Sequence, residues 1–151
     1  MADIVSTEKR SKMMSAIRGK DTKPELILRK GLHKLGFRYR LHDRRLPGKP
    51  DMVFPRYRAV IFVNGCFWHG HECHMFKWPS TREVFWDEKI TRNKNSDKVN
   101  VSRLLEMEWR VGVVWECALK GKYRLSGEEV IVLCEQWLQS DIPVLEIGGQ
   151  C

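Results

Sequence analysis

The sequence predicts a three-layer α/β domain, and three observations support this fold class. Along the 151 residues, helical and strand patterns follow the order helix, strands, helix, strand, helix. The 42% hydrophobic and 30% charged residues are typical of a globular protein with one core. The strand-like runs are short, apolar and bounded by turn residues. Elements in this order form a sheet with helices packed on its faces.

The first elements are a basic segment and a helix. Residues 8–20 place apolar side chains at helical spacing among lysines and arginines, which fits either a basic helix or arm, or a packed terminal helix with a solvated face. Leucines then recur at helical spacing in residues 24–35, with Pro24 in the first turn and Gly36 at the end. We therefore expect a helix over 24–35.

Three short strands follow. Residues 37–41 form the first, and the loop 42–49 after it contains a proline–glycine turn signal. Asp51–Phe54 and Ala59–Val63 are apolar and read as two further strands. Residues 64–81 are predicted to be an irregular loop.

The second half of the chain contains two more helical regions around one strand. Thr81 can cap a helix that starts near Arg82, and a helical pattern returns at 97–107, with a polar stretch at 92–98 that is either helical or a break. Residues 109–115 are rich in valine and predict a buried strand.

A capping box marks the last helix. Ser126 and Glu129 have its spacing, and apolar residues continue to Leu138. The sequence thus divides into a basic arm or helix at 1–20, a single domain at 21–140 and a C-terminal tail at 141–151.

The net charge of +8 and the pI of about 9.4 suggest a polyanionic partner. Lysine and arginine that neutralise phosphates release counterions, so nucleic acid is the expected partner, and the basic segment 8–20 could lie on DNA. The alternative is a merely basic protein. No apolar run reaches the roughly 18 residues of a membrane helix, and the first residues lack a signal peptide's apolar stretch. We expect an intracellular, cytoplasmic protein with no membrane contact.

The segment Gly65–Cys73, GCFWHGHEC, concentrates metal-binding side chains. Tetrahedral zinc sites use four cysteine or histidine ligands, and cysteines clustered with histidines in a reducing compartment favour metal over disulfides. This segment supplies three candidate ligands, Cys66, His71 and Cys73. The candidates for the fourth ligand are His69, His74, Cys117 and Cys134. The alternative is a set of buried cysteines beside a surface histidine cluster.

Topology favours Cys117 as the fourth ligand. The strands ending at Val63 and Trp115 are joined by a helical crossover, so they should be parallel. Their carboxyl ends then lie at one edge of the sheet, with Cys66 and Cys117 just beyond them. Cys134 reads as a helix core residue instead.

The pair Pro50-Asp51 predicts a magnesium site, since Mg²⁺ prefers one or two carboxylates, waters and phosphate oxygens. Pro-Asp is also a common turn. An apolar strand about ten residues on gives the layout of PD-(D/E)XK nucleases. The second half of that motif is absent, because the corresponding positions read Phe62-Val63-Asn64.

Five segments together resemble the very-short-patch repair (Vsr) mismatch endonucleases: RSKMMSAIRGKDTKPE, LPGKPD, GCFWHGHEC, TREVFWDEKI and WRVGVVWECAL. The resemblance covers about residues 8–138. It implies a restriction-endonuclease-like fold with a structural zinc, an active-site Mg²⁺ and double-stranded DNA as partner. It further implies a nick 5′ of the mismatched thymine in a T·G pair, which starts very-short-patch repair of deaminated 5-methylcytosine.

The resemblance also implies metal ligands. Asp51 and the Val63 backbone carbonyl would bind Mg²⁺, and Glu25 would contact a metal-bound water. The zinc ligands would be Cys66, His71, Cys73 and Cys117.

Catalytic and recognition roles follow from the same resemblance. His69 matches a proposed general base and Asp97 the carboxylate that orients it, while Phe67, Trp68 and Trp86 match residues that intercalate beside the mismatch. The alternative for the three aromatics is a place in the core, where Trp109, Trp115 and Trp137 are also expected.

One position departs from the family pattern. Asn64 stands where the best-known pattern has a histidine, and an amide exchanges hydrogen bonds but does not carry a proton at neutral pH. We therefore expect Asn64 to position water, or the enzyme to be slower.

The leading hypothesis is a Mg²⁺-dependent mismatch endonuclease, acting as a monomer at the bacterial nucleoid, with mismatch-repair proteins as further partners. The alternatives are a non-catalytic, zinc-stabilised DNA-binding module and a nuclease of the same fold that acts on other lesions.

Overall fold

The computed structural model describes residues 22–149. Its mixed α/β fold contains one five-stranded sheet in the order β1-β2-β3-β4-β5. The strands are β1 (Arg40–Leu41), β2 (Met52–Phe54), β3 (Ala59–Asn64), β4 (Arg110–Trp115) and β5 (Val144–Ile147). The first three strands pair antiparallel, whereas β3, β4 and β5 are parallel. The predicted N-terminal arm at 1–20 lies outside the described residues.

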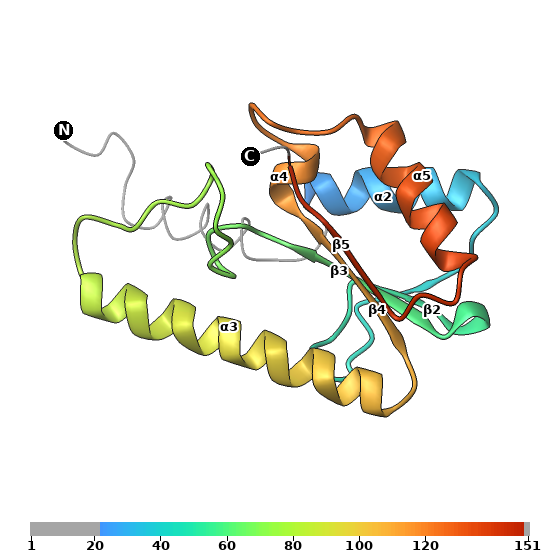
Figure 1. The fold of residues 1–151 in the computed structure, drawn as a ribbon, viewed down its shortest axis with the longest axis horizontal. Coiled ribbons are helices and arrows are strands. Elements are labelled where there is room, and N and C mark those ends of the chain that lie inside the picture. The colour runs from blue at the N-terminus through green and yellow to red at the C-terminus, as the bar shows by residue number, and fades with distance from the viewer. Residues whose placement is uncertain (1–21, 150–151) are drawn as a thin grey trace.

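Helices cover both faces of the sheet. The helices are α2 (Lys23–Lys34), α3 (Glu83–Glu106), α4 (Glu116–Leu119) and α5 (Gly127–Leu138), with a 3-10 turn, η1, at Pro55–Tyr57. Helices α2 and α5 lie on one side, and the long helix α3 lies on the other (Figure 1). The arrangement is the predicted three-layer one.

Alternation along the strands builds two apolar clusters. Met52 and Ile61 face the larger cluster, which α2 and α5 complete, while Val53 and Val60 face the smaller cluster beneath α3. Because successive side chains of a strand point to opposite faces, a sheet covered on both sides needs apolar residues at nearly every position. The continuous apolar strands of the sequence meet this requirement.

Two sequence-predicted helices are confirmed with small shifts in their ends. Helix α2 has proline in its first turn, and its end is closed by a hydrogen bond from Leu35 N to the Gly31 carbonyl. The hydroxyl of Ser126 accepts a hydrogen bond from Glu129 N at 3.1 Å, which caps α5 as expected.

In the region 82–107 the structure selects one of two alternatives that the sequence left open. Helix α3 is one uninterrupted helix of 24 residues, so the polar stretch at 92–98 is helical rather than a break. The cap at Thr81 was wrong, since Arg82 precedes the helix with φ 54° and no side-chain cap bond is formed. The buried residues of α3 are Ile90 and Leu104, which explains its weak apolar pattern.

Two predictions about strands were also inaccurate. The strand predicted at 37–41 is reduced to Arg40–Leu41. The tail predicted at 141–151 is wrong in part, because Val144–Ile147 forms β5 and pairs in parallel with β4. A strand added at the edge of a sheet needs little apolar sequence of its own, and Val144 is 48% exposed.

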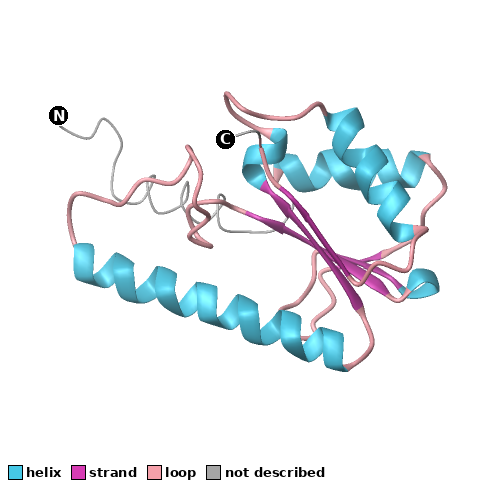
Figure 2. Cartoon of the chain, viewed as in Figure 1, coloured by secondary structure: helices cyan, strands magenta, loops and turns pink. Residues whose placement is uncertain are grey.

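The topology determines where the candidate site lies. The crossover from β3 to β4 through α3 makes these strands parallel, as predicted, so their carboxyl ends share one edge of the sheet. The long loop after β3 runs beside the N-terminal half of α3 (Figure 2). Among the described residues, no helix has the length and apolarity needed to cross a bilayer.

Candidate active site and metal centre

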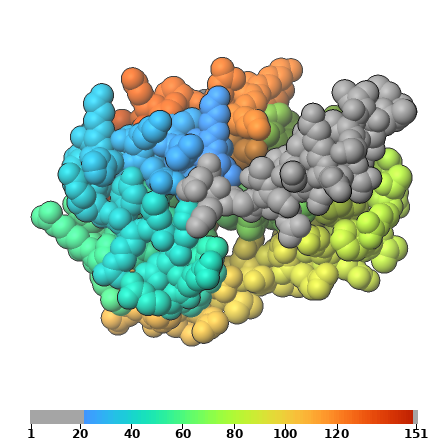
Figure 3. All heavy atoms as spheres, turned by 180° about the vertical axis from the view of Figure 1, so that it is seen from behind, coloured from blue at the N-terminus to red at the C-terminus, as the bar shows by residue number. Residues whose placement is uncertain are grey.

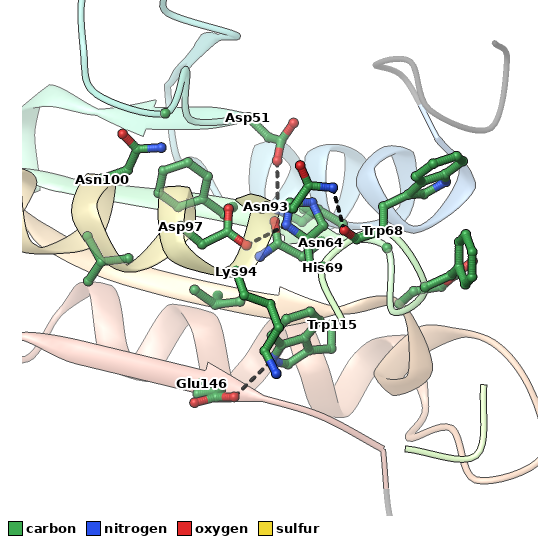
Figure 4. A pocket seen from close by; sticks show the side chains of 18 of the residues that line it. Asp51, Asn64, Trp68, His69, Asn93, Lys94, Asp97, Asn100, Trp115 and Glu146 are labelled. Carbon is green, nitrogen blue, oxygen red and sulfur yellow. Dashed lines mark hydrogen bonds and ion pairs between the residues drawn. The ribbon is translucent and has the colours of Figure 1, made fainter. Parts of the chain in front are cut away.

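A cleft of about 1250 Å³ opens between the sheet edge, the loop after β3 and α3. Asp51, Asn64, His69 and Asp97 all line it and lie close together in Figure 4. Five lysines also line the cleft: Lys49, Lys89, Lys94, Lys98 and Lys120. Carboxylate and imidazole groups at the floor, with ammonium groups around them, suit a polyanionic substrate.

Asp51 lies directly before β2 and is fixed by the neighbouring strand. Its Oδ2 accepts a hydrogen bond from Val63 N at 2.7 Å. This bond ties Asp51 to the residue whose backbone carbonyl was expected to share a cation with it. Asn64, the last residue of β3, is 8% exposed and lines the same cleft.

Behind Asp51 lies a buried carboxylate on α2. Glu25 is 2% exposed, and its Oε2 accepts from Arg29 Nη1 at 3.0 Å. His42 Nε2 lies 3.0 and 3.1 Å from the two Glu25 oxygens and 3.8 Å from Asp51 Oδ1. Ligand atoms of Glu25, His42 and Asp51 lie within 4.8 Å of one another, so the group could hold a metal ion. The expected proximity of Glu25 and Asp51 is therefore found, with a histidine that the sequence analysis missed.

We expect the protein without a divalent cation in this cleft to lose stability as the pH rises from about 4 to about 7. Burial raises the pKa of Asp51 from 3.8 to about 7, with the neighbouring Glu25 adding to the effect. The folded chain then binds more protons than the unfolded one, so the stabilisation is complete below pH 3.8 and is lost as the pH passes 7. Thermal unfolding across this range should show a shallower decline in Asp51→Asn. Equal declines in both proteins would contradict the raised pKa.

His69 and Asp97 form a close pair across the cleft. His69 Nδ1 lies 2.6 Å from Asp97 Oδ2, and the two residues come from the loop after β3 and from α3. A carboxylate at Nδ1 favours the tautomer with the proton on that nitrogen and leaves Nε2 free to accept a proton. Asn93 Nδ2 donates to the Trp68 carbonyl at 2.8 Å and holds the same loop against α3. The pair can thus act as an oriented base.

Four metal-binding side chains converge at the base of this loop. The ligand atoms of Cys66, His71, Cys73 and Cys117 lie within 4.8 Å of one another. His71 Nδ1 is 3.5 Å from Cys66 Sγ and 3.6 Å from Cys117 Sγ. Tetrahedral zinc with ordinary Zn–S and Zn–N bonds separates sulfur and nitrogen by about 3.6 Å. The cluster therefore fits a zinc ion in size and donor type.

A cation at this cluster would have to displace protons from the cysteines. Burial raises the pKa of the Cys66 thiol, with the neighbouring cysteines adding to the effect, and burial likewise raises the pKa of Cys117. Burial lowers the pKa of His71, which keeps its imidazole neutral. Several thiolates this close together would repel one another unless a metal ion compensated their charge. Cys134 lies in the apolar core, as the sequence suggested.

Neighbours from β4 and β5 support the cluster. The Trp115 ring stacks on His71 at 4.0 Å between centroids, and Trp115 Nε1 donates to Glu146 Oε1 at 2.8 Å. Trp115 was predicted to be a core residue, but it covers the candidate metal ligand instead. Gly149 N donates to Cys117 Sγ at 3.2 Å, a bond that stabilises a thiolate.

Gly149→Ala is expected to destabilise the protein by roughly 1–3 kcal/mol. A Cβ at Gly149 would come within 2.5 Å of the Cys117 carbonyl oxygen and 2.9 Å of the Tyr123 carbonyl oxygen, so the backbone must shift. Gly148→Ala is the matched control, because its Cβ would meet His71 at an ordinary 3.5 Å. Thermal unfolding and zinc retention under a chelator measure both effects. Equal behaviour of the two variants would refute this packing argument.

The three candidate intercalating residues, called the wedge residues below, form one aromatic cluster. The Phe67 ring lies 5.2 Å from Trp68 and 5.3 Å from Trp86, and Trp68 lies 5.7 Å from Trp86. None of the three belongs to the two apolar cores, and Trp78, which had no expected role, is 55% exposed. Gly70, with φ 62°, lets the loop approach α3, since a Cβ there would meet Ile90 and Lys94 at 2.8 Å.

Sequence comparison identifies the relatives of this chain. The family model for the DNA mismatch endonuclease Vsr matches residues 2–75. The DNA mismatch endonuclease Vsr of Escherichia coli K12 is 47% identical over 150 residues, which cover 99% of this chain and 96% of that protein.

The chain belongs to the Vsr family.

Other relatives of this Vsr chain are named as nicking enzymes. The type II nicking enzyme V.NmeAIP of Neisseria meningitidis is 48% identical over 122 residues, covering 81% of this chain and 87% of that protein. The type II nicking enzyme V.XorIIP of Xanthomonas oryzae is 46% identical over 119 residues, covering 79% and 88%. Membership of the Vsr family implies a nuclease fold for the five-stranded domain.

Proposed function

We propose that this Vsr protein is a Mg²⁺-dependent endonuclease that nicks duplex DNA 5′ of the thymine in a T·G mismatch and so initiates very-short-patch repair of deaminated 5-methylcytosine. One observation carries the proposal: the carboxylate of Asp51, the His69–Asp97 pair and two aromatic side chains, Phe67 and Trp68, line a single lysine-rich cleft. Trp86 packs against both of these aromatic rings. Relatives named as a mismatch endonuclease and as nicking enzymes support it.

The chemistry divides among this chain's own groups. Asp51 and the Val63 carbonyl would hold Mg²⁺, and Glu25 would bind a water on it. When bound, Mg²⁺ polarises the scissile phosphate and stabilises the leaving oxygen. His69 takes the proton of the attacking water at Nε2, while Asp97 holds Nδ1 and stabilises the imidazolium that forms.

Asn64 has a positioning role in this scheme. It is buried at the end of β3, beside the edge that carries Asp51, and its amide can orient a water or a phosphate oxygen. The lysines of the cleft supply the positive charge that attracts the DNA backbone.

The zinc in this proposal is structural. Cys66, His71, Cys73 and Cys117 would bind Zn²⁺ and fix the start of the loop that displays Phe67, Trp68 and His69. One pinned loop then carries both the base and two wedge residues, so mismatch sensing and catalysis are rigidly connected.

Trp68→Ala is expected to remove most of the preference for a T·G duplex over a matched duplex. Inserting aromatic side chains unstacks a base step at a cost of a few kcal/mol, and a wobble pair deforms more easily than a matched pair. Trp68→Phe is the matched control, since it retains an aromatic ring. Single-turnover nicking of both duplexes measures the ratio, and an unchanged ratio in Trp68→Ala would rule out the wedge.

The function is tested by incubating protein and Mg²⁺ with duplexes that differ only at one pair, T·G or matched. Cleavage confined to the T·G duplex and lost in Asp51→Ala supports the proposal. Binding without cleavage indicates the zinc-stabilised binding module, and cleavage indifferent to the mismatch indicates a nuclease for other lesions. We further propose a monomer that acts at the bacterial nucleoid and hands its product to mismatch-repair proteins.

A further inference from the structure

The loop between β1 and β2 brings His42 into contact with both carboxylates of the candidate cation site. His42 is the residue after β1, and its backbone N–H donates to the Asp51 carbonyl at 3.1 Å. This bond continues the antiparallel pairing of β1 with β2 by one step. On the surface, α2 (blue) and this loop (cyan to teal) lie beside each other (Figure 3). The hairpin therefore carries the imidazole to Glu25.

The geometry around Glu25 is that of a carboxylate held from two sides. His42 Nε2 lies 3.0 and 3.1 Å from its two oxygens, so in the tautomer with the proton on Nε2 one N–H is shared between them. Arg29 Nη1 donates to Oε2 at 3.0 Å from the next turn of α2. A carboxylate only 2% exposed needs such donors, because a buried charge without partners is costly.

The ligand atoms of His42, Glu25 and Asp51 all lie within 4.8 Å of one another, but His42 does not approach the two carboxylates equally. The 3.8 Å from Nε2 to Asp51 Oδ1 is too long for a hydrogen bond, so Glu25 is its direct partner. Asp51 Oδ2 accepts a hydrogen bond from Val63 N, whereas Oδ1 is the oxygen that lies 3.8 Å from His42 Nε2. His42 itself does not line the cleft, whereas Asp51 does.

We propose that His42 is a positioning residue of the cation site: it orients the Glu25 carboxylate toward Asp51 and thereby sets the affinity for the divalent cation. The inference rests on the proposed function, since it concerns the same cation. It assigns His42 a role through Glu25, without a bond from the imidazole to the metal. Residues that orient ligands in this way change metal affinity by about 10- to 100-fold when replaced.

The test compares two substitutions of similar reach. His42→Leu removes the N–H, whereas His42→Gln supplies an amide N–H that can still donate to Glu25. We expect the concentration of Mg²⁺ that gives half-maximal nicking to rise about 10- to 100-fold in His42→Leu, with kcat at saturating Mg²⁺ changed far less. His42→Gln should restore most of the affinity. The control is His33→Gln, which replaces an exposed histidine near the end of α2, the helix that carries Glu25.

A second measurement, of metal binding, does not depend on DNA nicking. Binding of Mn²⁺ to the full-length protein is measured by calorimetry. Electron spin-echo envelope modulation of the bound Mn²⁺ then shows whether a nitrogen atom is coordinated to it. We expect weaker binding in His42→Leu and no coupling of Mn²⁺ to an imidazole nitrogen in the wild type. A direct nitrogen coupling that disappears in His42→Gln would overturn the proposal, because His42 would then be a ligand.

Two further results would also overturn it. Lower thermal stability of His42→Leu with unchanged Mg²⁺ and Mn²⁺ affinity would mean a purely structural role, and tighter binding would mean that His42 competes with the cation. These results differ from those expected if the proposed function itself is wrong. In that case Mn²⁺ binding would survive Asp51→Asn, or the wild-type protein would not nick the mismatched duplex.

Discussion

Asp51→Asn is expected to lower the rate of mismatch nicking by at least about 1000-fold. Asp51 is the carboxylate at the floor of the cleft, and its Oδ2 is already positioned by Val63 N. A divalent cation at a phosphoryl oxygen is worth several kcal/mol in the transition state, and about 4 kcal/mol corresponds to this factor. The measurement is single-turnover nicking of a T·G duplex at saturating protein and Mg²⁺.

Asp141→Asn controls for the loss of one negative charge, since Asp141 is exposed and precedes β5. Binding of the T·G duplex by Asp51→Asn should be retained, because the lysines and the aromatic cluster are untouched. A rate within about tenfold of the wild type would show that Asp51 does not hold the cation and that other oxygen ligands bind it.

His69→Ala is expected to lower the rate at least about 100-fold, the usual scale for loss of general acid–base catalysis. The imidazole is oriented by Asp97 at 2.6 Å, so Asp97→Asn should also reduce the rate by weakening this orientation. The affinity for DNA and for Mg²⁺ should change little in either variant. Near-normal nicking by His69→Ala would remove the assigned base.

Asn64→His serves as the companion variant. Position 64 lies at the end of β3 and lines the same cleft, and a histidine there should retain nicking. If Asn64→His restored activity to His69→Ala, the base could act from either position, which would make proton transfer less dependent on the pinned loop.

Parallel topology allowed the metal cluster to be predicted from sequence. The crossover between β3 and β4 placed Cys66 and Cys117 at one edge, and the structure brings them within reach of His71 and Cys73. This inference depends only on the handedness and direction of strands, which the pattern of elements determines. The zinc itself stays a prediction.

The residues that sequence reasoning missed act through tertiary neighbours. Gly149 contacts Cys117 because β5 joins the sheet, and Trp115 covers His71 rather than entering the core. Neither contact has a local pattern. His42 had a weak signal, since a hairpin of residues 37–41 with 51–54 would have placed it opposite Asp51.

Helix α3 shows why periodicity left residues 92–98 undecided between a helix and a break. Residues 92–98 lie in the middle of the helix and are exposed or half-buried, and several of them line the cleft, so they need no apolar stripe. Asn93 and Asp97 are polar for the function of the cleft, where they bind the Trp68 carbonyl and His69. A polar face of this kind cannot be distinguished from a break in the helix by apolar periodicity alone.

If one cleft both senses the mismatch and cuts beside it, the T·G pair determines where the DNA is cut. A duplex with a single T·G pair, each strand carrying a different end label, is incubated with the protein and Mg²⁺ and the products are resolved to single nucleotides. We expect one nick, in the thymine strand, immediately 5′ of the mismatched thymine, and an intact guanine strand. Cuts in both strands, or at sites unrelated to the mismatch, would contradict it.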